Sequence, residues 1–525
     1  MADTRVLVSG SLSDATVEAV PRRSSITVER RPELVGEALL SALTQYDGWL
    51  VPPGFVVDEA HLDAARSLRV LGVLGADATA VDVLAASRRG VVVMHAPAGS
   101  ALAAAEHSLF LLGALARHIP AAASAARLGA DATRVGPGRE LSGATLGVVG
   151  FGHVGRLIAD RARGLHLHVL ASDPDLDDEL AEELGVERVE FDDLLARADF
   201  VSVQVPSTPA TRGLFGASTF AKMKSDALLV STARGDVLDR DALLHALESG
   251  TIAGAALDVE DPSDCSAKLL ERALCTPHLA GDTREARARI ETRALTQVLS
   301  YLEDGTIEGA VNVPNVPVGG AESLAPYLEI ARRLGSLLAQ LEEADPREVR
   351  VTCSGEAGRL GVSPVAHAVL AGFYSRRLGE TIHPVRAPHE AEQRGVEVVE
   401  VREMSSRYAA TVRVSVTSND GVHTATGALG TRGEPRLVGL EGYEIDAAMT
   451  GAALLMKNED RPGVIGAVGS LLGERGINVA RMQVGLDEES GRALALWMVD
   501  GAVPEDALQA LRALPHVESV RGVTI

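Results

Sequence analysis

Short apolar runs alternate with helical patterns in the first part of the chain. The runs rich in β-branched residues read RVLVSG, DGWLV, VLGVLG and GVVVMHAP, and stretches between them, such as DEAHLDAARSL, space apolar residues as an amphipathic helix does. Strands separated by helix-length segments are typical of repeated βα units, whose strands join a parallel sheet. The pattern therefore predicts an α/β fold for the N-terminal region.

A second α/β series follows a long helix of small residues. That helix reads SALAAAEHSLFLLGALARHI, and the strands after it read TLGVVGFG, HLHVLASD, FVSVQVP and ALLVSTA. Another long helix is expected at about 283–303, before the segment GAVNVPNVPVGGAES. The Pro and Gly content of that segment indicates a linker between domains.

Two smaller units are expected after this linker. The first extends to about residue 450 and contains the β-rich run RYAATVRVSVTSNDG. Residues 451–525 read strand, helix, strand, strand, helix, strand, with ALALWMVD expected as a core strand. That order suits a small ferredoxin-like α+β module.

Composition limits the functions that the chain can have. With 525 residues and 46% hydrophobic content, the chain is long enough for about three or four domains with buried cores. A formal net charge of -22 argues against a nucleic-acid partner, which a basic surface would have to bind. The three cysteines lie too far apart in sequence for a metal knuckle, and an odd number in so long a chain does not indicate a disulfide framework.

Targeting and membrane signals are also missing from the pattern. The N-terminus MADTRVLVSGSLSD has neither a basic segment nor a long apolar core. We expect no later apolar run to reach the ~18 residues that a membrane-spanning helix needs. We therefore expect a cytoplasmic protein with no membrane partner.

The strongest motif lies in TLGVVGFGHVGRLIADRARGLHLHVLASDPD. Gly150, Gly152 and Gly155 form G-x-G-x-x-G after a predicted strand and at the start of a helix, and Asp173 ends the next strand. The glycines allow a tight turn, close approach to a pyrophosphate and close helix packing, while the acid accepts from the adenosine ribose and disfavours a 2'-phosphate. The motif indicates NAD, with a glycine turn and an incidental acid as the alternative. The predicted cofactor contacts are Gly150, Gly152, His153, Val154, Gly155 and Asp173.

A second group of residues suits the chemistry of a hydroxy acid. Hydride transfer from an alcohol carbon needs a base, a cation for the carboxylate and a group that orients the base. Arg234 follows a strand in STARGD and could bind a carboxylate bidentately, and His278 in CTPHLAGDT could act as the base. Glu260 or Asp261 could hold the imidazole. Taken alone, a histidine in a loop is more often structural than catalytic. The order arginine, acid and histidine after a dinucleotide-binding motif favours a catalytic role.

These segments resemble a known family. GVVVMHAPAGSALAAAEHSLFLLGALARHIP, GFGHVGR, STARGDVLDRDALLHALESGTIAGAALDV and TPHLAGDT are similar to the D-isomer-specific 2-hydroxyacid dehydrogenases. RAPHEAEQRGVEV and GALGTRGEPRLVGLEGYEID resemble the intervening domain of the long-form D-3-phosphoglycerate dehydrogenase family. LLMKNEDRPGVIGAVGSLLGERGINVARMQVG resembles an amino-acid-binding ACT domain.

The resemblance implies a fold and an activity. It implies a Rossmann-type NAD-binding domain at 100–282 inserted in a flavodoxin-like substrate domain at 1–99 and 283–313, then an α+β intervening domain at 314–450 and a ferredoxin-like ACT domain at 451–525. The implied activity is NAD-dependent oxidation of D-3-phosphoglycerate to 3-phosphohydroxypyruvate, the first step of phosphorylated L-serine biosynthesis.

Site residues follow from the resemblance position by position. Arg234 matches the substrate-carboxylate arginine, His278 the catalytic histidine and Ser100 a substrate-binding position. The segment DVEDP is two residues shorter than the family pattern, so alignment on its proline puts Asp261 at the catalytic glutamate, with Glu260 just before it.

Several departures bear on the substrate. Pro52 and Val73 stand where the family has arginines, so a phosphate would lose charge-assisted contacts. These losses favour either a dehydrogenase for a less charged 2-hydroxy acid or a non-catalytic NAD-sensing regulatory protein as alternatives. The other departures are Asp77 at a glycine, Thr79 at an aspartate, Arg134 as the remaining basic residue of GADATRVG, and Asp236 at the second glycine of ARGG.

The ACT-like region departs less from its family. Asn458, Asp460 and Asn478 match positions that contact serine between paired ACT domains, and their side chains suit an ammonium and a carboxylate. The resemblance therefore implies an L-serine effector and a homo-oligomer, with a tetramer expected. The alternative is that NEDRPG is a turn that caps the next helix.

Overall fold

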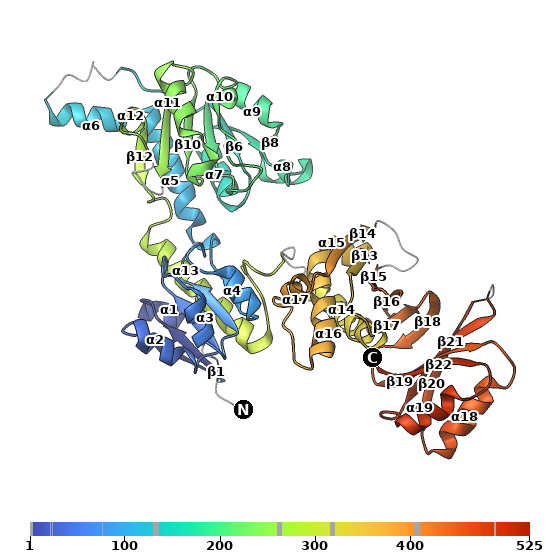
Figure 1. The fold of residues 1–525 in the computed structure, drawn as a ribbon. Coiled ribbons are helices and arrows are strands. Elements are labelled where there is room, and N and C mark those ends of the chain that lie inside the picture. The colour runs from blue at the N-terminus through green and yellow to red at the C-terminus, as the bar shows by residue number, and fades with distance from the viewer. Residues whose placement is uncertain are drawn as a thin grey trace.

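The computed structural model describes residues 4–21, 23, 25–75, 77–129, 136–259, 265–314, 321–403, 410–487 and 490–525. Within these ranges the strands form four sheets, which follow one another along the chain (Figure 1). The first two sheets belong to the blue and green lobes of the N-terminal half. The last two belong to the orange and red units of the C-terminal half.

The first sheet has five parallel strands in the order β2-β1-β3-β4-β5. This is the strand order of flavodoxin-like folds, which confirms the sequence prediction. Helices cover both faces, so β3 and β4 are buried along their whole length. The strands are β1 (Thr4–Val8), β2 (Ile26–Arg30), β3 (Gly48–Val51), β4 (Val70–Val73) and β5 (Val92–Met94), and the helices are α1 (Asp14–Ala19), α2 (Gly36–Leu43), α3 (Glu59–Ala64) and α4 (Val83–Arg88).

The second sheet has seven parallel strands in the order β12-β11-β10-β9-β6-β7-β8. Numbered from β6, this is the doubly wound order of dinucleotide-binding domains, extended by one strand. The strands are β6 (Thr145–Val149), β7 (His168–Ser172), β8 (Glu187–Arg188), β9 (Phe200–Val203), β10 (Leu228–Ser231), β11 (Gly254–Val259) and β12 (Leu274–Pro277). The helices are α6 (Ile119–Arg127), α7 (His153–Gly164), α8 (Asp178–Leu184), α9 (Phe191–Arg197), α10 (Ala217–Phe220), α11 (Arg240–Glu248) and α12 (Ala267–Arg272).

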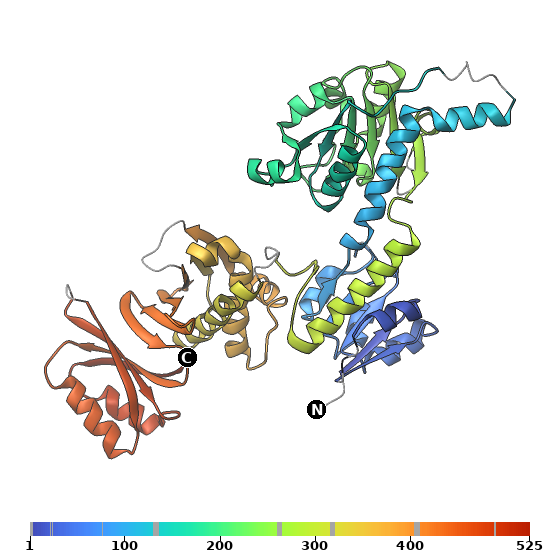
Figure 2. The ribbon, with the colours of Figure 1, turned by 180° about the vertical axis from the view of Figure 1, so that it is seen from behind.

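Two long helices, α5 (Ala98–Ala116) and α13 (Arg284–Asp304), join the two lobes (Figure 2). α5 leads into the second sheet, and α13 returns to pack on the first through buried residues such as Val298. The second lobe is therefore inserted in the first, as predicted. α5 is shorter than predicted because His118 adopts a left-handed conformation with φ 51° and starts α6.

The expectation that no apolar run approaches membrane-spanning length is wrong for α5. By length and composition this helix could cross a membrane. In the structure it packs against α7 and β10, with Ala105, Leu112 and Ala116 buried in the core of the second lobe. Small residues on a helix inside an α/β core give the same composition as a membrane segment.

The predicted linker is partly docked. Ala310 pairs with Met94 of β5 in an antiparallel bridge. The Asn312 Oδ1 accepts from the backbone N of Val93 at 2.9 Å, and its Nδ2 donates to the Val91 carbonyl at 2.8 Å. The first residues of the Pro- and Gly-rich segment, up to Asn312, thus pack on the first lobe, within the range of 283–313 expected for the substrate domain, while residues 315–320 lie outside the described ranges.

The third sheet has six strands in the order β14-β13-β15-β16-β17-β18, of which only the pair β13 and β14 is parallel. Helices α14 and α16 pack on this sheet and cross each other closely, because Gly335 on α14 and Gly372 on α16 lack side chains. A Cβ on Gly335 would lie 2.0 Å from the Val369 carbonyl oxygen. The elements are α14 (Ala321–Leu341), β13 (Glu348–Ser354), α15 (Gly355–Leu360), α16 (Val362–Leu378), α17 (Ala387–Gln393), β14 (Glu397–Glu403), β15 (Ala410–Thr417), β16 (Val422–Leu429), β17 (Pro435–Leu440) and β18 (Tyr443–Ala448).

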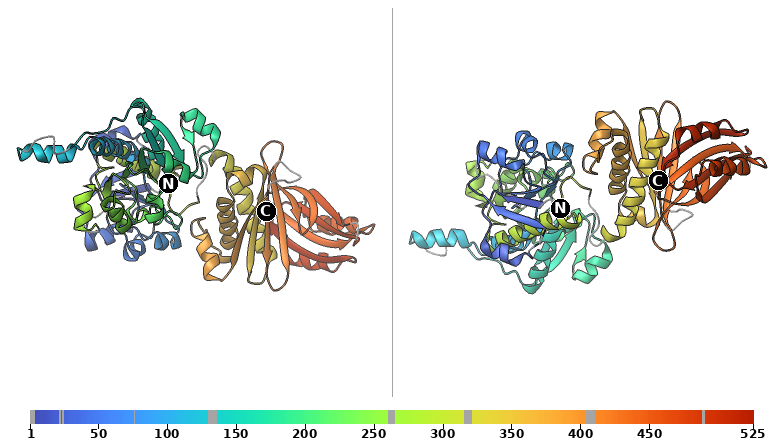
Figure 3. Two further views of the ribbon diagram at one scale, coloured as in Figure 1. Left: turned by 90° about the horizontal axis from the view of Figure 1, so that it is seen from above. Right: turned by 90° about the horizontal axis from the view of Figure 1, so that it is seen from below.

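The fourth unit has the predicted order of strands and helices. Its elements are β19 (Ala452–Glu459), α18 (Val464–Glu474), β20 (Val479–Asp487), β21 (Arg492–Val499), α19 (Glu505–Arg512) and β22 (Val517–Thr524). Trp497 on β21 is buried under α18 and α19, which confirms ALALWMVD as a core strand. The other face, with Leu455 and Leu494, shares a core with α14 of the third unit, and in Figure 3 the orange and red strands lie beside each other.

Candidate functional site

The glycine loop after β6 has the geometry that a dinucleotide needs. Gly150 has φ 92°, and a Cβ there would lie 2.8 Å from the backbone of Gln204. A Cβ on Gly155 would lie 2.2 Å from the Gly150 carbonyl oxygen, so this glycine sets the contact between α7 and the strand. A Cβ on Gly152 would meet no atom within 4 Å, which leaves space above the loop. Each glycine thus has the role that the motif assigns to it.

The start of α7 and the acid after β7 complete this loop. Gly152 is the N-cap of the twelve-residue helix and no side chain caps it, so the N-H groups of the first turn, at His153 and Val154, can face an anion. Asp173 accepts from the backbone N of Phe151 at 2.6 Å through Oδ2. The loop therefore holds the acid in place, and its remaining lone pairs can accept from a ribose. These residues fit NAD.

Arg234 follows β10 at the carboxyl end of the second sheet, where ligands of open α/β sheets bind. Its Nη2 lies 3.3 Å from Oδ2 of Asp77, which follows β4 in the other lobe. The backbone N and the hydroxyl of Thr79 donate to Oδ1 of Asp77 at 3.0 and 2.6 Å. Burial raises the pKa of Asp77, but the hydrogen bonds from Thr79 and the charge of Arg234 outweigh it and hold that pKa below its ordinary value.

His278 lies exposed in the loop after β12, with a left-handed backbone at φ 51°. A buried carboxylate, Asp258 at the end of β11, holds this loop. It accepts from the backbone N of Leu279 at 2.9 Å and of Ala280 at 2.8 Å, and from the Thr276 hydroxyl at 2.6 Å. Asp258 thus holds the backbone just after the candidate base and the side chain of Thr276 just before it.

The sequence reasoning missed Asp258. It considered only the acids at the end of DVEDP as partners of the histidine. The available signal was the single charged residue within the apolar strand GAALDV, because a charge inside a buried strand needs hydrogen-bond partners. His107 supports the same cluster, since its Nε2 lies 3.0 Å from the Thr276 hydroxyl.

Other predicted site residues have mixed outcomes. Glu260 and Asp261 lie outside the described residues, as does Arg134, so the choice between the two acids stays a prediction. Ser100 donates to the Pro97 carbonyl at 3.2 Å at the start of α5, and its Cβ lies 3.1 Å from the position a Cβ on Gly281 would take. Ser100 therefore lies against the loop of the histidine.

The two positions at which the family resemblance implies arginines, Pro52 and Val73, lie in apolar surroundings. Val73 at the end of β4 is buried, and Pro52 at the end of β3 is half-buried beside Gly10, whose Cβ would lie 3.2 Å from that of Pro52. Asp236 accepts from the Ser207 hydroxyl at 2.6 Å. The substrate-facing loops therefore lack the cations that the family resemblance implies at these places.

The effector residues of the fourth unit are not brought together within one chain. Asn458 and Asp460 lie where β19 ends, beside the start of β21, whereas Asn478 pairs with Asp500 just after β21 ends, with 2.8 Å between Nδ2 and Oδ2. At ~3.3 Å per residue the length of β21 separates them by roughly 25 Å. Gly463, the last residue of NEDRPG, is the N-cap of α18 and makes no side-chain hydrogen bond, so this segment leads directly into that helix.

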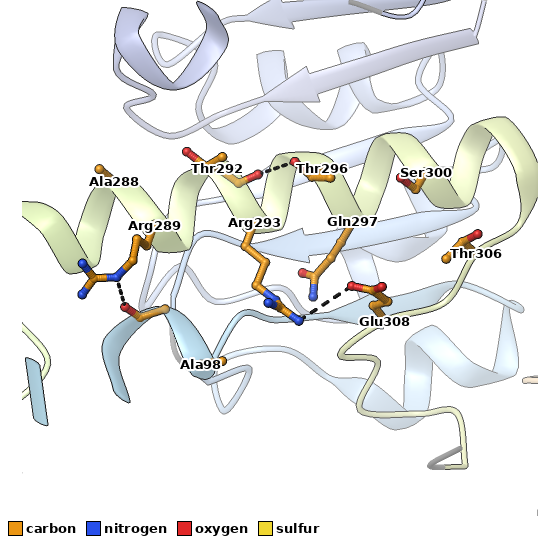
Figure 4. Close-up of a pocket in the computed structure, with 11 residues that line it drawn as sticks. Ala98, Ala288, Arg289, Thr292, Arg293, Thr296, Gln297, Ser300, Thr306 and Glu308 are labelled. Carbon is orange, nitrogen blue, oxygen red and sulfur yellow. Dashed lines mark hydrogen bonds and ion pairs between the residues drawn. The ribbon is translucent and has the colours of Figure 1, made fainter. Parts of the chain in front are cut away.

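A pocket of about 540 Å³ lies along α13 on the first lobe (Figure 4). Arg289 donates to the Gly99 carbonyl at 3.0 Å, and Arg293 lies 3.7 Å from Glu308. Neither Arg234 nor His278 lines this pocket, so it is separate from the candidate site. In the described part of the chain no cluster of His, Cys, Asp and Glu could hold a metal ion.

Comparison with known families identifies three domains. Residues 109–280 match the NAD-binding domain of the D-isomer specific 2-hydroxyacid dehydrogenases, residues 323–441 the D-3-phosphoglycerate dehydrogenase intervening domain, and residues 452–516 the ACT domain. The dinucleotide that the glycine loop fits is accordingly NAD.

Curated relatives match along almost the entire chain. D-3-phosphoglycerate dehydrogenase of Synechocystis is 33% identical over 99% of this chain and 95% of the relative. The enzyme of the same name from Methanocaldococcus jannaschii is 32% identical over 99% of this chain and 100% of the relative. The D-3-phosphoglycerate dehydrogenase of Bacillus subtilis is 33% identical over 99% of this chain and 99% of the relative.

Solved structures match the N-terminal half. A glyoxylate reductase from Paecilomyes thermophila superimposes with a TM-score of 0.52 at 29% identity, covering 59% of this chain and 99% of that structure. The apo-structure of D-lactate dehydrogenase from Escherichia coli superimposes with a TM-score of 0.50 at 26% identity, covering 59% of this chain and 99% of that structure. About three fifths of this chain is thus similar to almost the whole length of these two dehydrogenases.

Proposed function

Because the chain belongs to the D-3-phosphoglycerate dehydrogenase family, we propose that it oxidises D-3-phosphoglycerate to 3-phosphohydroxypyruvate with NAD, as the first step of L-serine biosynthesis. The observation that carries the proposal is the position of Arg234 and His278. Both follow strands of the sheet that bears the intact glycine loop, at the edge where its parallel strands end.

The chain's own groups have distinct roles in this reaction. Arg234 binds the substrate carboxylate through its planar guanidinium, and His278 accepts the proton of the substrate hydroxyl. Asp258 keeps the loop of His278 in place through the two backbone hydrogen bonds described above. NAD, when bound, supplies the acceptor for the hydride.

Nicotinamide absorbance with purified protein tests the proposal. We expect 3-phosphohydroxypyruvate to be reduced with NADH, and the variant His278→Ala to lose at least ~100-fold of the rate, because a positioned base contributes that much. Turnover that survives in His278→Ala would contradict the role of the histidine. NADH binding without turnover of any acid would contradict the enzymatic function and support an NAD-sensing role.

A less charged 2-hydroxy acid is a second candidate substrate, favoured by a specific observation. Val73 is buried and Pro52 is half-buried where the resemblance implies arginines, so neither can hold a phosphate. The same assay with hydroxypyruvate and 2-oxoglutarate compares the candidates. A higher kcat/KM for an unphosphorylated acid than for 3-phosphohydroxypyruvate would establish the second candidate and exclude the first.

We further propose that the fourth unit binds L-serine between two copies of the chain, in a homo-oligomer. The support is the separation of Asn458 and Asp460 from Asn478 along β21. One amino acid cannot contact both groups in one chain, whereas an antiparallel pair of units would bring them together. We expect L-serine to inhibit, and Asp460→Asn to weaken inhibition. A monomer in light scattering would contradict this arrangement.

A further inference from the structure

A carboxylate of the protein itself lies on the arginine that receives the substrate. Arg234 extends from the end of β10 in the NAD-binding lobe, and Asp77 from the loop after β4 in the other lobe. Their ion pair, with 3.3 Å between Nη2 and Oδ2, therefore crosses from one lobe to the other. Both residues follow carboxyl ends of parallel strands, where the ligand of such folds binds.

Asp77 is held in an orientation that suits this contact. Thr79 donates two hydrogen bonds to Oδ1, which leaves Oδ2 directed to Arg234. The charge of Arg234 and the neighbouring His95 both favour the ionised form of this carboxylate and lower its pKa. The side chains of Arg234 and Asp77 stay 38% and 44% exposed, so a ligand from solvent can reach and replace the contact.

Asp77 presents to Arg234 the same chemical group as a 2-hydroxy acid does. An incoming substrate carboxylate must either displace Asp77 from the guanidinium or bind beside a second negative charge, and both cost binding free energy. The cost grows with the number of negative charges on the substrate. 3-Phosphohydroxypyruvate carries a phosphate dianion in addition to its carboxylate, whereas hydroxypyruvate carries the carboxylate alone.

On the premise of the second candidate function, NAD-dependent dehydrogenation of a less charged 2-hydroxy acid, we propose that Asp77 is a specificity-determining residue, which occupies the carboxylate subsite on Arg234 and selects against polyanionic 2-hydroxy acids. The aspartate does not take part in hydride transfer. It sets how much of the arginine's charge a substrate can use, and it adds a repulsive charge against an acid that carries negative groups besides its carboxylate.

Steady-state kinetics of Asp77→Asn tests this proposal against wild type. We expect KM for hydroxypyruvate to fall about tenfold, as one lost repulsion of ~1.4 kcal/mol implies, and KM for 3-phosphohydroxypyruvate to fall further, with the smaller change in kcat. The matched control is Asp63→Asn, which removes an equal charge from an exposed acid that pairs with Arg89 in the same lobe. The control should change neither KM. Equal KM values in Asp77→Asn and wild type, for both acids, would overturn the proposal.

The variant Thr79→Val distinguishes the effect of the Asp77 charge from the effect of the shape of its loop. This variant keeps the carboxylate but removes a hydroxyl hydrogen bond that orients it, so KM should take a value between those of wild type and Asp77→Asn. A larger fall in KM than in Asp77→Asn would mean that the loop's shape, and not the charge, determines selection.

A binding experiment keeps this proposal distinct from the proposed function. Oxamate, an unreactive acid with one carboxylate, is titrated into the NADH complex while NADH fluorescence is recorded. Even in a protein that turns over no acid, Asp77→Asn should bind oxamate about tenfold more tightly than wild type, and Arg234→Ala should bind it more weakly. Unchanged oxamate affinity in Asp77→Asn would reject the role of Asp77 whatever the outcome of the turnover assay.

Discussion

The loop after β6 and the loop after β4 both lie at the carboxyl end of a strand in a parallel sheet, but different features determine their structure. In the nucleotide loop, atoms of the backbone itself fill the space that any side chain on Gly150 or Gly155 would need. In the loop after β4, by contrast, a single side chain makes the contact to the other lobe, since Asp77 pairs with Arg234, and the strand before it ends at the buried Val73. We therefore expect backbone geometry to preserve the cofactor site, and side chains of the loop after β4 to tune the substrate without a change of fold.

Glycine substitutions in the nucleotide loop should break this comparison most strongly. We expect Gly155→Ala to lower the free energy of unfolding by ~3 kcal/mol and to abolish NADH binding, because its Cβ would lie 2.2 Å from the Gly150 carbonyl oxygen. Gly152→Ala is the matched control, since its Cβ would meet no atom within 4 Å. Urea denaturation and NADH fluorescence titration measure the two effects.

The control variant has its own expected outcome. Gly152→Ala should unfold like wild type but bind NADH more weakly, because the methyl group would occupy the space that the pyrophosphate needs. If both alanine variants lost the same stability, the assignment of separate packing and ligand roles to these glycines would be wrong.

Sequence reasoning predicted the features that depend on local pattern. The glycine motif, the positions of Arg234 and His278 after strands, and the order of elements in the fourth unit all follow from short-range spacing. The contact between Asp77 and Arg234 could not be predicted in this way, because it joins loops from two lobes. The shared core of Leu455 with α14 was also missed, since alternation along a strand shows that a face is apolar but not what covers it.

Asp258 was missed for a related reason. A carboxylate that accepts backbone hydrogen bonds from a distant loop leaves no motif around itself, and the nearby acids of DVEDP drew attention because they resemble a known pattern. Docking of Asn312 on β5 was missed because Pro and Gly content describes the backbone and not its side-chain contacts. These misses all concern contacts between segments far apart in the sequence.

Asp258→Ala should have an intermediate effect. It tests a third loop, the one that carries His278 after β12, which the buried side chain of Asp258 holds in place. The variant leaves the backbone N-H groups of Leu279 and Ala280 without their acceptor, which costs ~2 to 3 kcal/mol of stability. We expect kcat to fall about tenfold to 100-fold, because His278 loses its fixed position, while NADH affinity stays as in wild type. Thr276→Val removes only the hydroxyl donor to Asp258 and should have a smaller effect on kcat. A loss of NADH affinity in Asp258→Ala would instead indicate that the whole lobe is disturbed.

Pro52→Arg should have the smallest effect. It tests whether a single side chain at the carboxyl edge of the first sheet changes the substrate preference. Pro52 is half-buried at the end of β3, so an arginine there can extend its guanidinium to solvent near the carboxyl edge of the sheet. We expect KM for 3-phosphohydroxypyruvate to fall about threefold to tenfold, as one exposed charge-assisted contact allows, and KM for hydroxypyruvate to stay unchanged. Pro52→Gln controls for loss of the ring. If both acids bound more tightly in Pro52→Arg, the new charge would act on the common carboxylate, and the phosphate of the substrate would lie elsewhere in the cleft.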